Sequence, residues 1–329
     1  MKRHGLCKAP AERACIPVFF AVDDRYAPCL SVALRSLGEN ASQRYCYRIH
    51  ILISTLKEET MAALRTLERE NLSIEFVSVK DRLDRISGML HLRDYYSKAT
   101  YYRFFVPELF PEYERGIYLD CDMVVQGDIS RLYRTNLGDC LLAAVHEDVM
   151  DREEPFFQYV EEVLDMPCRD YFNAGMLLMN LKEMRRFALE ARFVELLGKR
   201  TFRLTQDQDY LNVLTYGRTV LLDRSWNVTS FPEAPAYITP NIVHYKIHWK
   251  PWHFSGVRFE ELFWRYAKDT PYAAELEQTL RTYSAEEQAR DEEGYRSIIA
   301  LARQEVEAAR QQRSAEEAQG LFASLPDLA

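Results

Sequence analysis

The sequence has no long apolar run, no cysteine pair of the C-x-x-C type and no excess of basic charge. Its longest apolar segments, such as residues 16–22 and 175–179, fall far short of the roughly 18 to 20 residues that a membrane-spanning helix needs. The seven cysteines are odd in number and widely spaced, which predicts neither a disulfide framework nor a zinc site and fits a reducing cytosol. A net charge of −8 leaves no broad basic surface, so we expect no nucleic acid partner.

Two nucleotide-binding signatures are also missing. Neither G-x-G-x-x-G nor G-x-x-x-x-G-K-[ST] follows an expected strand, which disfavours a dinucleotide-binding dehydrogenase and a P-loop NTPase. Residues 1–14 carry four basic side chains but no continuous apolar stretch, so they do not resemble a secretory signal. We expect residues 1–15 to be a loose leader and the protein to be cytoplasmic, with peripheral contact at the inner membrane face left open.

The apolar residues that are present follow the rhythm of an α/β protein. Residues 16–22, 48–53 and 73–79 are typical of strands, and residues 30–37 and 58–70 carry apolar side chains at helical spacing. This order predicts a mostly parallel sheet, in which ligands collect at the carboxyl ends of the strands. Three polar groups follow expected strands: Asp23 with Asp24, Asp120 with Asp122, and His244.

Asp120 and Asp122 are the strongest metal-ligand candidates. At positions i and i+2 of an extended chain their carboxylates share one side, while Cys121 points to the other. An Asp-x-Asp pair is common at solvated strand ends, but this one lies between the apolar segments 117–119 and 123–125, where unpaired carboxylates would be costly. A divalent ion between them could neutralise the charge that grows on a departing diphosphate.

A second cluster, residues 244–253, crowds imidazole, ammonium and indole groups into one run. It could be a surface turn with aromatic packing. If His244 completes the carboxylate site instead, the mixed oxygen and nitrogen ligands favour Mn²⁺, with Mg²⁺ as the alternative. Lys250 could then neutralise a phosphate oxygen.

Taken together, these motifs make residues 16–272 resemble glycosyltransferase family 8, which contains bacterial lipopolysaccharide galactosyl- and glucosyltransferases and the glycogenins. The landmarks are FAVDDRY at 20–26, YLDCD at 118–122, FNAG at 172–175, QDQD at 206–209, and HY with KPW at 244–252. The resemblance implies a GT-A-type α/β/α sandwich with a mostly parallel central sheet. It also implies retaining transfer of a hexose from UDP-glucose or UDP-galactose to a carbohydrate acceptor such as a lipopolysaccharide core.

The same resemblance implies roles for individual residues. Asp120, Asp122 and His244 match Mn²⁺ ligands, and Asp207 and Gln208 match catalytic residues around the transferred sugar. The donor contacts it implies are Ala21, Asp23, Tyr26, Arg103, Asp120, Cys121, Asp122, Asn173 and Lys250. Two positions depart from the family pattern: Arg25 replaces a common asparagine, and Ile247 stands where a glycine often approaches the diphosphate.

Two other functions stay open at this stage. A self-glucosylating primer like glycogenin would use a tyrosine of its partner subunit, and the chain has 20 tyrosines. A catalytically silent UDP-sugar-binding scaffold would keep the fold without the chemistry.

The pattern of residues 282–329 predicts a charged helical tail beyond the 16–281 domain. We expect the tail to be dispensable for chemistry but to associate with a protein partner or a membrane surface, because its apolar stripe (Tyr295, Ile298, Ile299, Ala302 and Val306) would otherwise face water.

Overall fold

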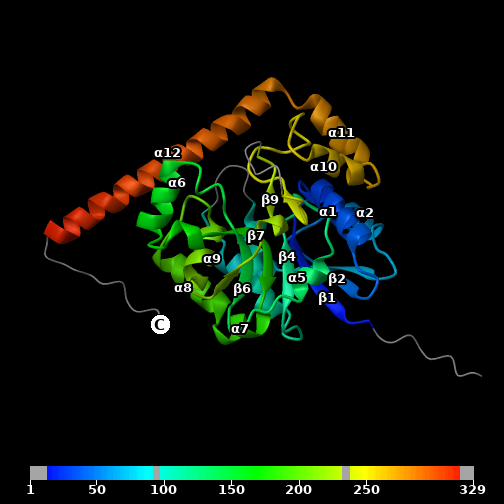
Figure 1. Cartoon of the computed structure of the whole chain (residues 1–329), viewed down its shortest axis with the longest axis horizontal. Coiled ribbons are helices and arrows are strands. Elements are labelled where there is room, and N and C mark those ends of the chain that lie inside the picture. Colours follow the sequence, from blue (N-terminus) through cyan, green and yellow to red (C-terminus); the bar gives the residue numbers. More distant parts are fainter. Residues whose placement is uncertain (1–12, 92–96, 232–237, 319–329) are drawn as a thin grey trace, which may run out of the picture.

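The computed structural model describes residues 13–91, 97–231 and 238–318, and its centre is a seven-stranded sheet (Figure 1). The strands run in the order β3-β2-β1-β4-β7-β6-β8. Parallel pairs join β1 to β2 and β4, β2 to β3, and β6 to β8, whereas β7 is antiparallel to both β4 and β6. Their bounds are β1 Cys15–Ala21, β2 Cys46–Ile53, β3 Leu72–Ser78, β4 Gly116–Leu119, β6 Leu142–His146, β7 Phe172–Met179 and β8 Thr219–Leu221.

Helices cover both faces of this sheet. Along β1, Val18 and Phe20 pack in one apolar core and Phe19 and Ala21 in another, because successive side chains of a strand point to opposite faces. A strand buried on both faces needs a continuous apolar run, which is what residues 16–22 supply. The predicted α/β/α sandwich with a mostly parallel sheet is therefore confirmed.

The helices on the face of the first core are short and regular. They are α1 Ala27–Asn40, α2 Glu58–Arg65 and α5 Ile129–Tyr133. The predicted helix 58–70 is too long, because backbone bonds from Thr66, Leu67 and Glu68 reach back only three residues and tighten the chain into turns. The hydroxyl of Thr66 also donates to the carbonyl of Ala63 at that end.

The opposite face carries a longer series of helical segments. It comprises α3 Lys80–Ile86, the 3₁₀ helix η1 Lys98–Phe105, α4 Val106–Leu109, α6 Glu154–Gln158, the π-helix η2 Tyr159–Val163, the 3₁₀ turn η3 Cys168–Asp170, α7 Leu181–Arg186, α8 Leu189–Lys199 and α9 Asp207–Thr215. Most of their buried side chains belong to the second core, with Phe19 and Ala21 of β1.

A small second sheet lies beside α1 and positions one of the candidate ligands. Its strand order is β5 (Met123–Val125), β10 (Ile242–His244) and β9 (Val228–Thr229). The 3₁₀ turn η4 (Arg224–Trp226) comes just before β9 in the chain. In this sheet β10 pairs antiparallel with β5, and His244 is opposite Met123. Because Met123 directly follows Asp122, this pairing brings His244 to the two carboxylates.

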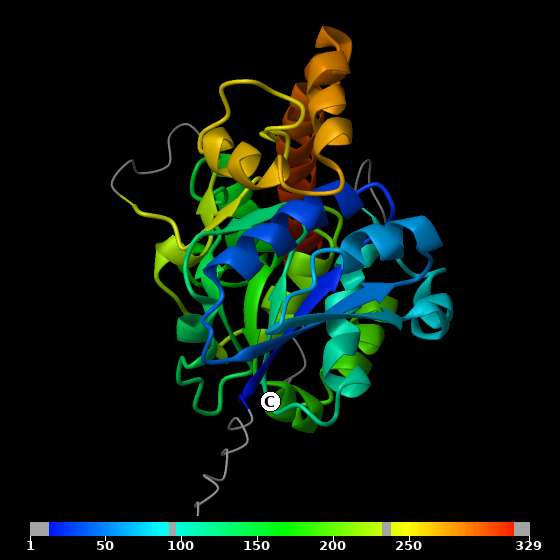
Figure 2. The ribbon, with the colours of Figure 1, turned by 90° about the vertical axis from the view of Figure 1, so that its right-hand side faces the viewer.

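The C-terminal segment forms α10 (Glu260–Ala267), α11 (Ala273–Thr282) and the long helix α12 (Ala285–Ala318). In Figure 2 these yellow to red helices lie at the end of the sheet to which the arrow of β1 points. Ile298, Ala302 and Val306 of α12 are buried, with exposed fractions of 7%, 0% and 2%, where the helix packs on α6 and η2. The premise that this stripe would face water without a partner is therefore wrong, because α6 and η2 of the same chain cover it.

Three further expectations concern the ends of the chain, its membrane segments and its cysteines. The predicted leader, residues 1–15, lies mostly outside the described residues, and Cys15 already begins β1. No helix in the described part of the chain combines the length and the apolar character needed to cross a membrane. The six cysteines within the described ranges are all free.

Candidate active site

A single pocket collects every candidate residue at the carboxyl ends of β1 and β4. The amino end of β7 lies at this same edge because β7 runs antiparallel to its neighbours. The candidates that line the pocket are Ala21, Asp23, Tyr26, Arg103, Asp120, Cys121, Asp122, Asn173, Asp207, Gln208, His244 and Lys250. Residues up to 229 positions apart in the chain therefore share one cavity.

Asp120, Asp122 and His244 form a three-ligand cluster. One ligand atom from each lies within 4.8 Å of the others. His244 Nε2 is 3.1 Å from Asp122 Oδ1 and 3.9 Å from Asp120 Oδ2, and Lys250 Nζ donates to Asp122 Oδ2 at 2.5 Å. Burial raises the pKa of Asp122, but Lys250 and His244 outweigh burial and hold that pKa well below its ordinary value, so Asp122 is an anion.

The imidazole of His244 is oriented by Asn227. The amide nitrogen of Asn227 donates to Asn173 Oδ1 at 2.8 Å, which leaves its oxygen to accept from His244 Nδ1 at 3.1 Å. With an ion bound, a neutral ring would carry its proton on Nδ1 and direct the lone pair of Nε2 to the ion. A hydrogen bond to the far nitrogen is the usual support of a histidine that binds a metal.

Space for an ion depends on Gly175. A Cβ atom at this position would lie 2.5 Å from His244 Cε1 and 2.6 Å from Asp120 Oδ2, closer than any real Cβ contact. Because Gly175 has no side chain, the space between His244 and Asp120 stays open. Two carboxylates, a correctly oriented imidazole and an open cradle together fit a divalent ion that accepts mixed oxygen and nitrogen ligands.

Arg103 links the metal cluster to the catalytic candidates. Its buried guanidinium lies 3.0 Å from Asp120 Oδ1 and 3.1 Å from Asp207 Oδ2, and it also donates to the carbonyl of Ala174. Burial raises the pKa of Asp207 to about 7, against the opposing pull of Arg103. One arginine thus contacts both a carboxylate of the metal cluster and a carboxylate of the catalytic candidates.

Gln208 is held in a fixed orientation. Its Oε1 accepts from the backbone N–H of Ala174 at 2.9 Å and from Asn173 Nδ2 at 3.2 Å, and its Nε2 donates to the hydroxyl of Tyr171 at 3.2 Å. The alternative interpretation of residues 206–209 as a helix start holds as well, because α9 begins at Asp207. Both features are compatible, since the first turn of the helix points the amide into the pocket.

At the first strand, Asp23 and Tyr26 line the pocket beside Ala21. Asp23 Oδ1 accepts from the backbone N–H of Tyr26 at 3.2 Å, and Asp23 Oδ2 pairs with the exposed guanidinium of Arg25. Cys121 points away from the carboxylates, as predicted, and its thiol donates to the carbonyl of Ala21 at 3.1 Å. Burial raises the pKa of this thiol well above its ordinary value.

Several pocket residues escaped the sequence analysis. Glu147 accepts from Asn173 Nδ2 at 2.5 Å and from Lys246, which also pairs with Asp148 at 3.1 Å. The only available signal was a carboxylate just after an apolar strand. His248 lies in a turn with aromatic packing, as one alternative for residues 244–253 predicted, but it is buried against the ring of Tyr295, at 5.3 Å between ring centroids. Ile247 lines the pocket with a φ of 59°, an unusual value for a β-branched residue.

Comparison with known proteins agrees with this geometry. The chain is 27% identical over 255 residues to the lipopolysaccharide 1,2-glucosyltransferase of Escherichia coli K12, covering 73% of each protein. It is 26% identical over 271 residues to glycosyltransferase GlyB of Streptococcus pneumoniae, covering 76% of this chain but only 61% of the relative.

Among solved structures, galactosyltransferase LgtC in complex with donor and acceptor sugar analogs superposes with a TM-score of 0.66 at 28% identity, covering 78% of this chain and 96% of LgtC. The sequence pattern of glycosyl transferase family 8 matches residues 17–256, which include all the candidate ligands and catalytic residues. The chain belongs to glycosyltransferase family 8.

Proposed function

We propose that this transferase moves a hexose from a UDP-sugar to a glycan acceptor and retains the anomeric configuration of the donor. The observation that carries the proposal is the cluster of Asp120, Asp122 and His244 in the same pocket as Asp207 and Gln208. The likeness to LgtC, whose structure holds donor and acceptor sugar analogs, supports a two-substrate transfer. The oriented imidazole argues against a silent scaffold, which has no need of it.

Asp120, Asp122 and His244 would hold the ion, with Mn²⁺ preferred and Mg²⁺ as the alternative. When bound, such an ion stabilises negative charge on the oxygens of a departing diphosphate. Lys250 supplies a second positive charge beside Asp122, and Arg103 keeps Asp120 oriented. Asp23 and Tyr26, which line the pocket after the first strand, are proposed to bind the uridine.

The proposal of retention rests on membership of family 8 and is supported by the chemistry of Gln208. An inverting enzyme needs a base that activates the acceptor hydroxyl on the face opposite the leaving group. Gln208 cannot accept a proton, and its amide is fixed by Ala174, Asn173 and Tyr171. We propose that the carbonyl oxygen of Gln208 stabilises positive charge on the sugar, while Asp207 orients the sugar hydroxyls.

The donor is proposed to be UDP-glucose or UDP-galactose, and the acceptor a lipopolysaccharide core or related glycan. The E. coli relative is named for glucosyl transfer to lipopolysaccharide and LgtC for galactosyl transfer. The two hexoses differ at one hydroxyl, and the pocket lining includes both charged and amide groups that could read it.

The test is hydrolysis of UDP-glucose and UDP-galactose without acceptor, measured as UDP release with Mn²⁺, Mg²⁺ or a chelator. We expect Mn²⁺ to give the highest rate, the chelator to abolish it, and GDP to compete less well than UDP. The anomeric proton coupling of a transfer product then reports stereochemistry. Absence of UDP release with every metal would refute the proposed donor, and a β-linked product would refute retention.

A further inference from the structure

The pocket has two chemically different parts. Beside the polar groups of the metal cluster, one stretch of the lining consists of apolar side chains that all belong to the second core or to its edge. These are Val149, Met150, Phe156, Leu204, Tyr295 and Ile298. We call this set the apolar wall.

Two members of the apolar wall come from α12. Tyr295 and Ile298 are three residues apart, so they lie on the same face of the helix. The ring of Tyr295 contacts Phe156 of α6, with ring centroids 6.2 Å apart, and His248 at 5.3 Å. These contacts connect the helix to the domain on one side and to the loop that follows His244 on the other.

The start of α12 is also fixed. Asp291 accepts from the hydroxyl of Tyr283 at 2.8 Å and pairs with His253 Nδ1 at 3.2 Å, and the amide of Gln288 donates to the carbonyl of His253 at 3.0 Å. The rings of His253 and Tyr283 stack with centroids 3.8 Å apart. The wall is therefore preformed, and part of it lies beyond residue 256, where the family pattern ends.

We propose that the apolar wall binds an alkyl aglycone carried by the acceptor sugar, and that Ile298 is a specificity-determining residue for it. This inference rests on the proposed function, because it assigns the polar part of the pocket to the UDP-sugar. A free saccharide would turn hydroxyl groups toward the carbon side chains of Phe156, Leu204 and Ile298, which cannot form hydrogen bonds, and this is unfavourable. Each buried CH₂ of an alkyl chain instead strengthens binding by about fourfold.

The test compares octyl and methyl β-glycosides of glucose and galactose as probes. Their dissociation constants are measured on the full chain with UDP and Mn²⁺ present, below the micelle concentration of the octyl compounds. We expect at least one octyl glycoside to bind ten times more tightly than its methyl counterpart. Equal affinity of the two, or no binding of either octyl glycoside, would overturn the proposal.

A matched pair of variants identifies the wall as the cause. Ile298→Asn places an amide in the pocket, whereas Ile299→Asn changes the next residue, which packs on the same core without lining the pocket. We expect the octyl preference to fall to about twofold in the first variant and to persist in the second. Loss of the preference in both variants, or in neither, would contradict the role of Ile298.

UDP-hexose hydrolysis in the same preparations separates this inference from the proposed function. Hydrolysis requires only the metal cluster and the donor, so Ile299→Asn, which lies outside the pocket lining, should retain it within about twofold of the unmodified chain. Hydrolysis with no octyl preference would refute the acceptor class alone. No hydrolysis by the unmodified chain would refute the proposed donor, while the octyl and methyl comparison would still report on the wall.

Discussion

The metal cluster and the apolar wall face the same pocket but are built by opposite means. In the cluster, each polar side chain has a second partner that fixes it: Asn227 for His244, Arg103 for Asp120 and Lys250 for Asp122. In the wall, the side chains pack in the second core or at its edge, and two of them come from α12. We therefore expect a change in the cluster to reduce donor hydrolysis more than a change in the wall does.

This difference suggests how donor and acceptor recognition can diverge. The cluster lies wholly within residues 17–256, the part of the chain that matches the family. The wall draws on α12, outside that match. A family can keep one donor site and still change acceptors by altering the helix that closes the pocket.

The largest loss of activity should come from Gly175→Ala, which places a methyl group among the metal ligands. The added Cβ would meet His244 Cε1 and Asp120 Oδ2 at 2.5 and 2.6 Å, so the ligands must move apart. We expect Mn²⁺-dependent hydrolysis to fall roughly a hundredfold or more, since displacements of about 1 Å at a site have that effect. The measurement is UDP release across a Mn²⁺ titration.

Gly198→Ala is the matched control. Gly198 is exposed on α8, with nothing within 4 Å of an added Cβ. Alanine should leave hydrolysis unchanged and stabilise the helix by up to about 1 kcal/mol. Equal activity of the two variants would show that Gly175 does not keep the cluster open.

The fold and the cluster could be predicted because their signals are local. Apolar runs predicted β1, β2 and β3, and the apolar segment 117–119 lies in β4. Asp120 and Asp122 were identified by their spacing and by the buried strands around them. The antiparallel direction of β7 was not predicted, because its apolar run would suit either direction of a fully buried strand.

The supporting residues and the apolar wall could not be predicted because they depend on contacts between distant segments. Nothing in the sequence distinguishes Asn227 from other asparagines. It reaches His244 only because β9, which follows it, pairs with β10. Tyr295 and Ile298 were recognised as one face of a helix, but periodicity does not say what covers that face. The short segments α6 and η2, which cover it, left no clear pattern.

Asn227→Ala sharpens the comparison by removing support without touching a ligand. His244 Nδ1 loses its acceptor, so the ring can rotate or shift its proton to Nε2. We expect the Mn²⁺ concentration for half-maximal hydrolysis to rise roughly 10- to 100-fold, the usual cost of losing such a partner. The maximal rate at saturating Mn²⁺ should change much less.

Asn71→Ala is the control for loss of a buried amide. Its Nδ2 donates to the carbonyls of Ser42 and Tyr45, far from the pocket lining. This variant should lose some stability but keep the same Mn²⁺ dependence. If both asparagine variants shift the dependence alike, the effect is general instability rather than orientation of His244.

A smaller effect is expected from Val306→Ala, which tests whether α12 is part of the domain. Val306 is 2% exposed beneath the helix, and its truncation removes two buried carbon atoms. The free energy of unfolding should fall by roughly 2 kcal/mol, and donor hydrolysis should stay near normal. Arg303→Ala, an exposed position of the same helix, should change the unfolding midpoint little. Unchanged stability of Val306→Ala would mean that the helix detaches in solution.

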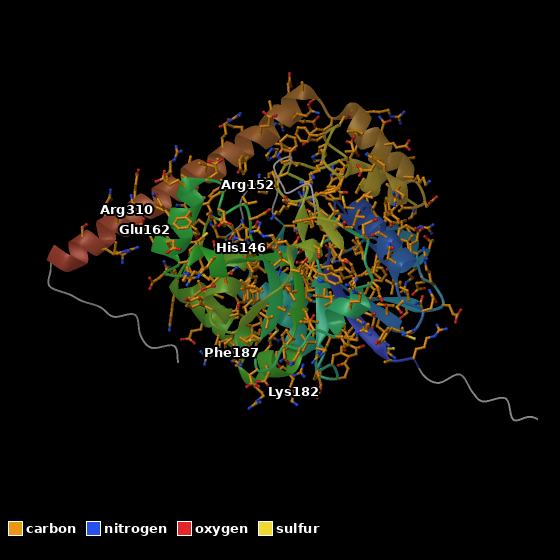
Figure 3. All side chains as sticks on the ribbon, viewed as in Figure 1. His146, Arg152, Glu162, Lys182, Phe187 and Arg310 are labelled. Atoms are coloured by element: carbon orange, nitrogen blue, oxygen red, sulfur yellow. The ribbon has the colours of Figure 1, made fainter. Side chains whose placement is uncertain are left out.

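The smallest effect should come from Glu162→Gln, which breaks the ion pair at the far end of α12. Glu162 accepts two hydrogen bonds from Arg310, at 2.7 and 2.5 Å, and the two side chains lie side by side in Figure 3. The Arg310 guanidinium lowers the pKa of Glu162 below its usual 4.5, so the pair contributes stability above that pH, and the contribution disappears as the pH falls through the lowered value.

About half of the Arg310 side chain is exposed, at 53%, and salt screens such exposed pairs beyond about 8 Å at physiological ionic strength. We therefore expect the melting temperatures of the variant and the unmodified chain to differ slightly at neutral pH in low salt. The difference should shrink as the pH falls through the lowered pKa of Glu162, or as the salt concentration rises to about 0.5 M. If the melting temperatures still differ under both conditions, the contact stabilises the chain by packing rather than by charge. The end of α12 would then be held to the domain in the same way as the part of the helix that carries the apolar wall.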